Sequence, residues 1–465
     1  MTEAITDRRG ALAAICFLVA TVAFLALHPR LGITDSDCEG YVIGARSLLE
    51  GKGYVHVQGY PLSHWPPGYS WLLAQAADTG QAARLVNAVS VGVATAALAL
   101  LAVQGGWPVA GAGALAAVFG FGLFRHLAAE VKPDMLTYAL FLVGALLYVR
   151  DGIGWRLGAL ALWSALMPFK LIAMVFAPGV LLAEGFRQGW GNFLRTQWRV
   201  YLGAALVWLI FFGGIIWFNV HTTGHVTPPT IVRTTVAGFA GEVFRFFESS
   251  LRSGLVCWYG SVRVPQILLP YLALLLLGLA ALASLRPSSP GALLRWMGGG
   301  VLAVSWILMV MRQYYAGPRL MGYGLLLLLA GLVPLATRLR LWQIFAAGTL
   351  LLAIYNAAAV SRLGANHPAY EASAKAAQPK LKPGQPVFSN APILLWVHLG
   401  IPATGGKLVD APPGAQYVEV TLPNYDAIAQ PVNLPLPRDG SWRQVAAWDG
   451  GALFEKSAAA APAPL

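Results

Sequence analysis

The sequence is dominated by uninterrupted apolar runs about as long as a bilayer-crossing helix. Examples lie at 11–27, 202–220, 267–285 and 320–336. Only 11% of the 465 residues are charged and 57% are hydrophobic, so polar side chains are too few to cover a water-soluble globule. Because roughly 20 apolar residues in a helix span the hydrocarbon core, the runs predict an integral membrane protein.

We predict an all-α polytopic membrane domain over residues 1–360, with about eleven transmembrane helices. They are expected near 11–27, 82–104, 108–124, 134–149, 157–169, 171–186, 201–220, 266–285, 296–311, 319–336 and 341–360. Pro168 and Lys170 interrupt the fifth and sixth spans, and we expect a tight turn there. One long kinked helix is the alternative, and it would reverse the orientation of everything downstream.

The placement of Lys and Arg favours a cytoplasmic N-terminus. The segments then expected inside carry these basic residues: Arg8, Arg9, Arg150, Arg156, Arg187, Arg195, Arg199, Arg286, Arg295, Arg338 and Arg340. Basic residues also occur in the outer segments, so the rule favours this orientation without requiring it. An odd number of spans places the C-terminus outside, which in a bacterial inner membrane is the periplasm.

Two parts outside the spans are expected to be ordered. The first outer loop, about 28–81, is expected to hold interfacial helices around "SDCEGYVIGARSLLEG" and "WPPGYSWLL". Residues 361–465 are poorer in apolar runs, and "QPVFSNAPILLW" and "AQYVEVTL" are typical of short strands. We therefore predict a small C-terminal α/β periplasmic domain over 361–465.

Charge and metal-ligand patterns exclude some functions. The net charge is +12, but Lys and Arg are scattered singly, which argues against a nucleic-acid partner. Three cysteines form no metal-ligand spacing, although Cys38 and Cys257 have the option of pairing outside the cytoplasm. Four histidines are expected outside: His56, His64, His221 and His225. His221 and His225 are four residues apart but lie in a stretch rich in Thr, Gly and Pro, so no metal site is expected.

Three carboxylates, Asp35, Asp37 and Glu39, alternate at the start of the first outer loop. Helix capping accounts for one of them, or two. The functional interpretation is a general base at the water–lipid boundary, which takes a proton from an acceptor while the donor stays in lipid.

The same loop resembles that of the GT-C superfamily, most of all the polyprenyl-phosphate-sugar transferases of glycosyltransferase family 39. These include the protein O-mannosyltransferases and the lipid A aminoarabinose transferases. The resemblance rests on Asp37, Tyr41, Ala45, Leu48, Gly51, Gly53, Tyr54, Pro66, Pro67, Gly68, Tyr69, Leu72 and Leu73. It extends through "AARLVNAVS", "EVKPDMLTYALFLVGALLY" and "RQYYAGPRLMGYGLLLLLAG".

The resemblance implies a GT-C fold and an inverting glycosyltransferase without a cofactor. A sugar on a polyprenyl phosphate would be attacked by a hydroxyl or amine of a cell-envelope lipid, glycan or protein. Asp37 matches the aspartate that in the family acts as base or positions the acceptor, with Asp35 as the second choice. The implied substrate-binding residues are Glu39, Tyr41, Tyr54, His64, Glu130, Asp134, Lys170, Arg312, Tyr315 and Arg319.

The basic residues have a chemical role in such a reaction, because the leaving phosphate develops negative charge. Lys170 interrupts an apolar stretch, where a charge is costly and usually functional. For Lys170, Arg312 and Arg319 the structural alternative is an interfacial anchor. For Asp134 it is a helix N-cap.

Two other classes of function stay open. A transporter or flippase of a lipid-linked glycan intermediate predicts broken helices with polar residues at mid-membrane, often in two related halves. Here the acids gather at one face and no internal repeat is visible, which favours transfer. The third interpretation is a non-catalytic assembly subunit.

Overall fold

The computed structural model describes residues 2–32, 36–55, 61–62, 65–223, 291–312 and 322–331, and in the C-terminal part 372–373, 375–389, 395, 403–404, 411–420, 441–449 and 451–457. Contacts gather the chain into two compact units. The first comprises Met1–Pro29, Ala83–Ala129 and Pro133–Ser361, and the second comprises Arg30–Ala82, Glu130–Lys132 and Arg362–Leu465. The domain boundary expected after residue 360 stays a prediction.

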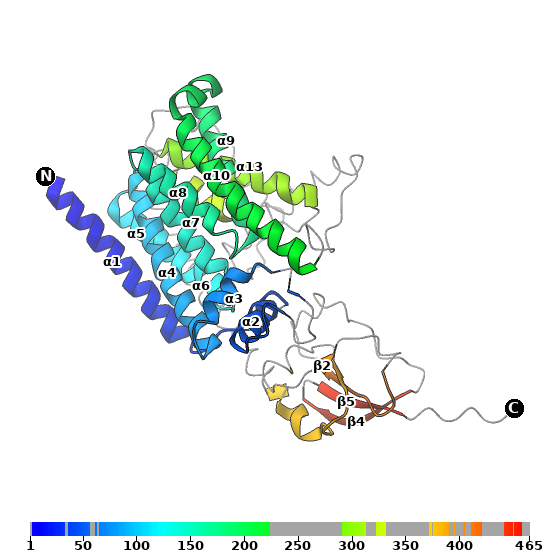
Figure 1. Cartoon of the computed structure of the whole chain (residues 1–465). Coiled ribbons are helices and arrows are strands. Elements are labelled where there is room, and N and C mark those ends of the chain that lie inside the picture. The colour runs from blue at the N-terminus through cyan, green and yellow to red at the C-terminus, as the bar shows by residue number, and fades with distance from the viewer. Residues whose placement is uncertain are drawn as a thin grey trace, which may run out of the picture. The chain divides into compact units, whose positions relative to one another are not determined.

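The first unit is built from helices, with α1 along one edge against α5 (Figure 1). The helices are α1 (Thr2–Leu27), α4 (Thr79–Gln104), α5 (Val109–Phe119), α6 (Arg125–Ala128), α7 (Asp134–Tyr148), α8 (Ile153–Ala165), α9 (Phe176–Gln188), α10 (Trp190–Thr223) and α13 (Ala292–Arg312). A further short apolar helix is Gly322–Gly331. The spans expected at 266–285 and 341–360 lie outside the described residues.

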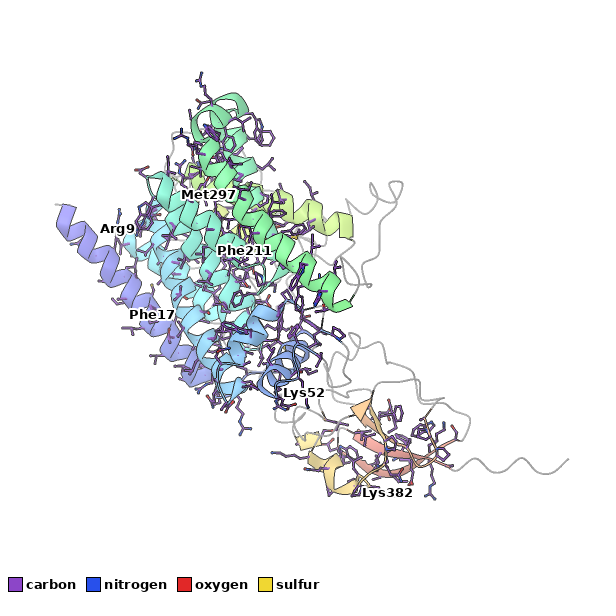
Figure 2. The ribbon with its side chains drawn as sticks, viewed as in Figure 1. Arg9, Phe17, Lys52, Phe211, Met297 and Lys382 are labelled. Atoms are coloured by element: carbon purple, nitrogen blue, oxygen red, sulfur yellow. The ribbon has the colours of Figure 1, made fainter. Side chains whose placement is uncertain are left out.

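Four helices of the described part are long and apolar enough to cross a membrane, judged by length and composition: Arg8–Leu27, Thr79–Gln104, Leu171–Gln188 and Trp190–Thr222. Two of them, α1 and α10, carry Phe17 and Phe211 (Figure 2). They also expose large apolar side chains such as Val22 and Ile210. Such surfaces are unfavourable in water and ordinary in lipid, which indicates a membrane location. The count of eleven spans stays a prediction.

The helix that begins at Val109 changes its winding before it ends. α5 passes into a π-helical turn, η1 (Gly120–Phe124), and then into α6. A π-helical turn holds one more residue than an α-helical turn, so it changes which side chains point inward afterwards. Arg125 follows directly and is buried, with 3% of its surface exposed.

The chain reverses direction between α8 and α9. Arg156, in the first turn of α8, places its guanidinium 5.7 Å from the ring centre of Tyr148. Glu184, in the last turn of α9, lies within electrostatic range of the same tyrosine. One continuous helix would separate positions 156 and 184 by about 42 Å. The expected tight turn is therefore confirmed, and the long kinked helix is wrong.

Glycines allow close contact between the helices that follow. A Cβ on Gly179 of α9 would lie 2.7 Å from the Cα atom of Val301 in α13. A Cβ on Gly298 of α13 would lie 2.6 Å from the carbonyl oxygen of Gly324. Both neighbours are backbone and cannot move aside, so only glycine fits. Met297, next to this contact, is fully buried (Figure 2).

The second unit contains two short helices and a sheet. α2 (Ser36–Leu49) and α3 (Pro67–Leu73) confirm the two helices expected in the first loop. α3 begins with Pro67 at its first position, where the missing N–H costs nothing. Cys38 on α2 is buried, and Cys257 lies outside the described residues, so their pairing stays a prediction.

The sheet has five strands in the order β2-β1-β3-β5-β4. They are β1 (Val387–Ser389), β2 (Ala403–Thr404), β3 (Gln416–Val420), β4 (Trp442–Trp448) and β5 (Gly451–Lys456). β1 pairs in parallel with β2 and β3, whereas β3, β5 and β4 are antiparallel neighbours. Its core packs Tyr417 and Trp442 with Phe388 and Phe454. The strands expected in "QPVFS…" and "AQYVEVTL" are thus present.

Candidate functional site

Asp37, the expected base, is held by a tryptophan from the far side of its loop. It lies in the first turn of α2 and is half-buried. The indole Nε1–H of Trp65 donates a hydrogen bond to its Oδ1 atom at 3.0 Å. Gly40, one turn along α2, makes room for the indole, because a Cβ there would lie 2.6 Å from ring atom Cε2. The carboxylate therefore has a fixed orientation.

The two expected substrate-binding tyrosines of this loop are buried. The Tyr54 hydroxyl donates to the backbone oxygen of Trp65 at 3.1 Å, and burial raises the pKa of Tyr54 well above its ordinary value. The Tyr41 ring meets Tyr69 edge-on, with ring centres 5.4 Å apart. The backbone oxygen of Tyr41 accepts a hydrogen bond from the Ser70 hydroxyl at 2.9 Å. Both tyrosines thus fix α2, α3 and Trp65 together, and their contact with a substrate stays a prediction.

Lys170 and Asp134 form an ion pair between two segments of the first unit. The side chains keep only 11% and 1% of their surfaces exposed, respectively. Pro133 is the N-cap residue of α7 and Asp134 is the first residue of the helix proper, so the N-cap interpretation of Asp134 is wrong. Its charge lies in the first turn, where the helix dipole favours an anion. The pairing of two expected site residues is consistent with a shared role.

The break in the chain explains how Lys170 reaches Asp134. Pro168 has no N–H with which to continue α8, and the chain turns. The N–H of Lys170 donates to the oxygen of Leu166 at 3.0 Å. Lys170 is extended, and the 3₁₀ turn η2 (Leu171–Val175) follows it. The indole of Trp208 on α10 donates to the oxygen of Met174 at 2.9 Å, which anchors η2.

Glu130 forms a local ion pair with Lys132 in the second unit. The lysine side chain is buried, with 5% exposed, whereas the glutamate keeps 30% exposed. The segment is held by a backbone bond from the Val131 N–H to the Gly32 oxygen at 3.1 Å. The pair therefore gives the buried Lys132 ammonium a partner within its own segment.

For the other expected site residues, the structure describes either the backbone alone or nothing. Asp35, His64, Tyr315 and Arg319 lie outside the described residues. Glu39 is in α2 and Arg312 ends α13, but their side chains are not described. Their roles stay predictions. Among the residues that the structure does describe, no three His, Cys, Asp or Glu side chains gather as metal ligands would.

Sequence reasoning missed a cluster at the end of α1. The Nε–H of Arg125 donates to His28 Nε2 at 2.9 Å. Arg84 donates to the backbone oxygens of His28 and Leu25, each at 2.8 Å, and so closes the C-terminus of α1. Burial and, secondarily, the charge of Arg125 lower the pKa of His28 from 6.5 to about 4. No local pattern links these residues, because Arg84 and Arg125 follow His28 by 56 and 97 positions.

The chain was compared with known proteins. No protein-family model matches it, and no curated protein matches it. The crystal structure of ArnT from Cupriavidus metallidurans bound to undecaprenyl phosphate is similar, with 15% identity over 100% of both chains and a TM-score of 0.45. The apo structure of ArnT from the same organism has 14% identity over 97% of this chain and 98% of that chain, and a TM-score of 0.46. A likeness of this degree assigns no function.

Proposed function

We propose that this protein is an integral membrane inverting glycosyltransferase. It moves a sugar from a polyprenyl-phosphate donor to a hydroxyl or amine of a cell-envelope lipid, glycan or protein, at the periplasmic face of a bacterial inner membrane. The observation that carries the proposal is Asp37, a half-buried carboxylate held by the Trp65 indole in a chain with membrane-length helices.

Asp37 is assigned as the general base. An acceptor hydroxyl gives its proton to the carboxylate as its oxygen bonds to the anomeric carbon of the donor sugar. The bond between that carbon and the phosphate oxygen breaks, and its electron pair leaves with the polyprenyl phosphate. Attack opposite the leaving group inverts the anomeric carbon. The hydrogen bond from Trp65 supports this role because it fixes the orientation of the carboxylate before an acceptor arrives.

We assign Lys170 the role of stabilising the negative charge on the leaving phosphate. A cation already in place stabilises the charge that develops in the transition state without reorganisation. The pairing of Lys170 with Asp134 supports the assignment, because it holds the ammonium in surroundings where an unpaired charge is costly. We propose Arg312 and Arg319 as further cations for the leaving phosphate. We propose Tyr315, Glu39, His64 and Glu130 as residues that contact the donor or the acceptor substrate.

A transporter of lipid-linked glycans is the second candidate. The observation that favours it is the extended residue Lys170 between α8 and η2, because transporters often place charged residues at broken helices. Transport alone predicts that no covalent product forms. The two candidates are therefore separated by the chemistry of the product.

The test is Asp37→Asn, with Glu50→Gln as the matched control. Glu50 follows the same helix and makes a surface ion pair with Lys52, which is labelled in Figure 2. Purified variants in nanodiscs are given lipid extract from cells that lack the protein, and mass spectrometry follows free polyprenyl phosphate and glycosylated products. We expect Asp37→Asn to lose about 10²–10⁴-fold in rate, as removal of a general base does, and Glu50→Gln to keep its rate. Full activity of folded Asp37→Asn would remove the assignment.

A further inference from the structure

Three buried polar atoms gather at the end of α7 that is opposite Asp134. They are Tyr148 Oη on α7, Arg156 Nε on α8 and Glu184 Oε1 on α9. Tyr148 and Glu184 have no exposed surface. Within the described part of the chain, none of the three atoms has a hydrogen-bond partner. A buried polar atom without a partner is strongly unfavourable, so three in one place require an explanation.

The three side chains face one another. The Arg156 guanidinium lies 5.7 Å from the ring centre of Tyr148. Glu184 lies within electrostatic range of the Tyr148 hydroxyl, and Tyr201 of α10 is its hydrogen-bonding neighbour, although the two hydroxyls do not meet at the distance and angle of a direct hydrogen bond. Gln197 completes the group from α10, because its Oε1 atom accepts from Arg156 Nη1 at 2.8 Å. Four helices thus contribute to one polar cluster.

The other atoms of the cluster are already satisfied by direct bonds. Glu184 Oε2 accepts from Arg187 Nη2 at 2.8 Å and also from Gln188 Nε2. Glu184 Oε1 therefore needs a hydrogen-bond donor, and Arg156 Nε needs a hydrogen-bond acceptor. An anion has no hydrogen to donate to the carboxylate, and a metal cation has no lone pair to accept from the guanidinium. A ligand that both donates and accepts hydrogen bonds satisfies both groups, and the Tyr148 hydroxyl can donate to this ligand or accept from it.

We propose that this cluster is a binding site for internal water, which links α7, α8 and α9 through Tyr148, Arg156 and Glu184. Buried waters commonly make about three hydrogen bonds to polar groups that lack other partners, as here. The site is independent of the proposed transfer reaction. It lies at the other ends of the helical segments that carry Asp134 and Lys170, so it fixes α7 and α9 relative to each other.

The first test is X-ray hydroxyl-radical footprinting of the full chain in nanodiscs. Radiolysis of a bound water marks the side chain beside it even where bulk solvent is excluded. Phe141 is the matched control, because it lies on the same helix and is also fully buried. With each rate divided by the intrinsic reactivity of its residue type, we expect Tyr148 to be modified several-fold faster than Phe141. Equal, slow rates show a dry cluster and overturn the proposal.

The second test is an experimental structure at a resolution that shows water. We expect density within hydrogen-bond distance of Glu184 Oε1, Arg156 Nε and Tyr148 Oη. Glu184→Leu should lose this density and the fast labelling of Tyr148. A direct bond between Arg156 Nε and Glu184 Oε1, or a lipid or detergent hydroxyl in place of water, overturns the proposal.

A milder variant serves if Glu184→Leu does not fold. Tyr148→Phe removes one hydroxyl and keeps the aromatic ring, so the water should stay on Arg156 and Glu184. Labelling is then followed at Tyr201, which lies beside the cluster. A rate for Tyr201 equal to that in the wild type supports the water, and a rate as slow as that of Phe141 overturns it.

Discussion

At the residue scale, two buried charges define the chemistry of the first unit. Lys170 and Asp134 lie 36 positions apart and pair in surroundings that exclude most water. A buried pair of this kind seldom stabilises a fold more than apolar residues would, whereas loss of one member is costly. The presence of such a pair therefore points to a use for the charges themselves.

Single and double substitutions separate the stability of this pair from its function. Asp134→Leu removes the ion pair from Lys170, and we expect about 3–5 kcal/mol of destabilisation. The double variant Asp134→Leu with Lys170→Met removes both charges, so thermal stability should return toward wild type while transfer stays lost. Thermal unfolding and product formation are measured on the same samples. A double variant that regains activity contradicts the role of Lys170.

His28 gives the protein a defined response to acid. Its pKa is lowered from 6.5 to about 4 in the folded state, so the unfolded chain binds the proton more tightly. Stability from neutral His28 is complete above pH 6.5 and is lost as pH falls toward 4. The loss is at most about 3 kcal/mol, and less where solvent screens the ring.

The measurement is thermal unfolding of wild type and His28→Gln between pH 7 and pH 4. Gln keeps an acceptor for Arg125 and does not titrate. We expect wild type to lose more stability than His28→Gln across this range, since carboxylates affect both proteins alike. Parallel curves would contradict the role given to His28.

At the element scale, the apolar runs predicted most of the described helices but not all of their ends. α7 starts at Asp134 as expected, whereas α10 starts at Trp190 and not near 201. Residues 190–200 include Arg195 and Arg199, which end an apolar run but do not end a helix. Hydropathy shows which part of a helix lies in lipid, but the helix can extend beyond that part into polar surroundings.

The partners within the site were beyond prediction from single elements. The motif singled out Asp37, but nothing in the sequence links this residue to Trp65, 28 positions away. The pairing of Lys170 with Asp134 depends on the reversal after α8, and no local pattern encodes it. Residue types reveal where chemistry is concentrated, and only the packing of helices decides which groups meet.

The contact between α9 and α13 gives a prediction for an element. Gly179→Ala would place a Cβ 2.7 Å from the Cα atom of Val301, so the helices must separate. We expect a loss of about 1–3 kcal/mol, as for overpacked cores. Gly299→Ala is the matched control on α13, because a Cβ there meets nothing within 4 Å. Thermal unfolding should show a lower midpoint for Gly179→Ala alone, and equal midpoints contradict the contact.

At the scale of the whole molecule, the chain combines a lipid-facing helical unit with a mixed sheet. The sheet holds an aromatic core around Tyr417, and burial raises the pKa of that hydroxyl to about 12. Such a core is typical of a domain in water, and from the odd number of expected spans we predict that it lies on the side opposite the N-terminus. The side of the membrane on which the sheet lies decides on which side the protein would meet its acceptor substrate.

Reporter fusions test this arrangement. Alkaline phosphatase fused after residue 457 should be active, because that enzyme folds in the periplasm, and green fluorescent protein at the same place should be dark. The same two reporters are also fused to a chain truncated after residue 152, between α7 and α8. There we expect inactive alkaline phosphatase and fluorescent green fluorescent protein. Fluorescence from the fusion after residue 457 contradicts the predicted orientation.

The π-helical turn Gly120–Phe124 has a consequence for how this chain tolerates insertions and deletions. Deleting one residue there would remove the extra residue of the wide turn and restore the ordinary winding, so the residues downstream would keep their faces. Deleting one residue from the regular part of α5 would instead rotate everything downstream by about 100° about the helix axis, and Arg125 would point away from His28. The wide turn is therefore the place in this helix where a chain shorter by one residue keeps the contact between Arg125 and His28.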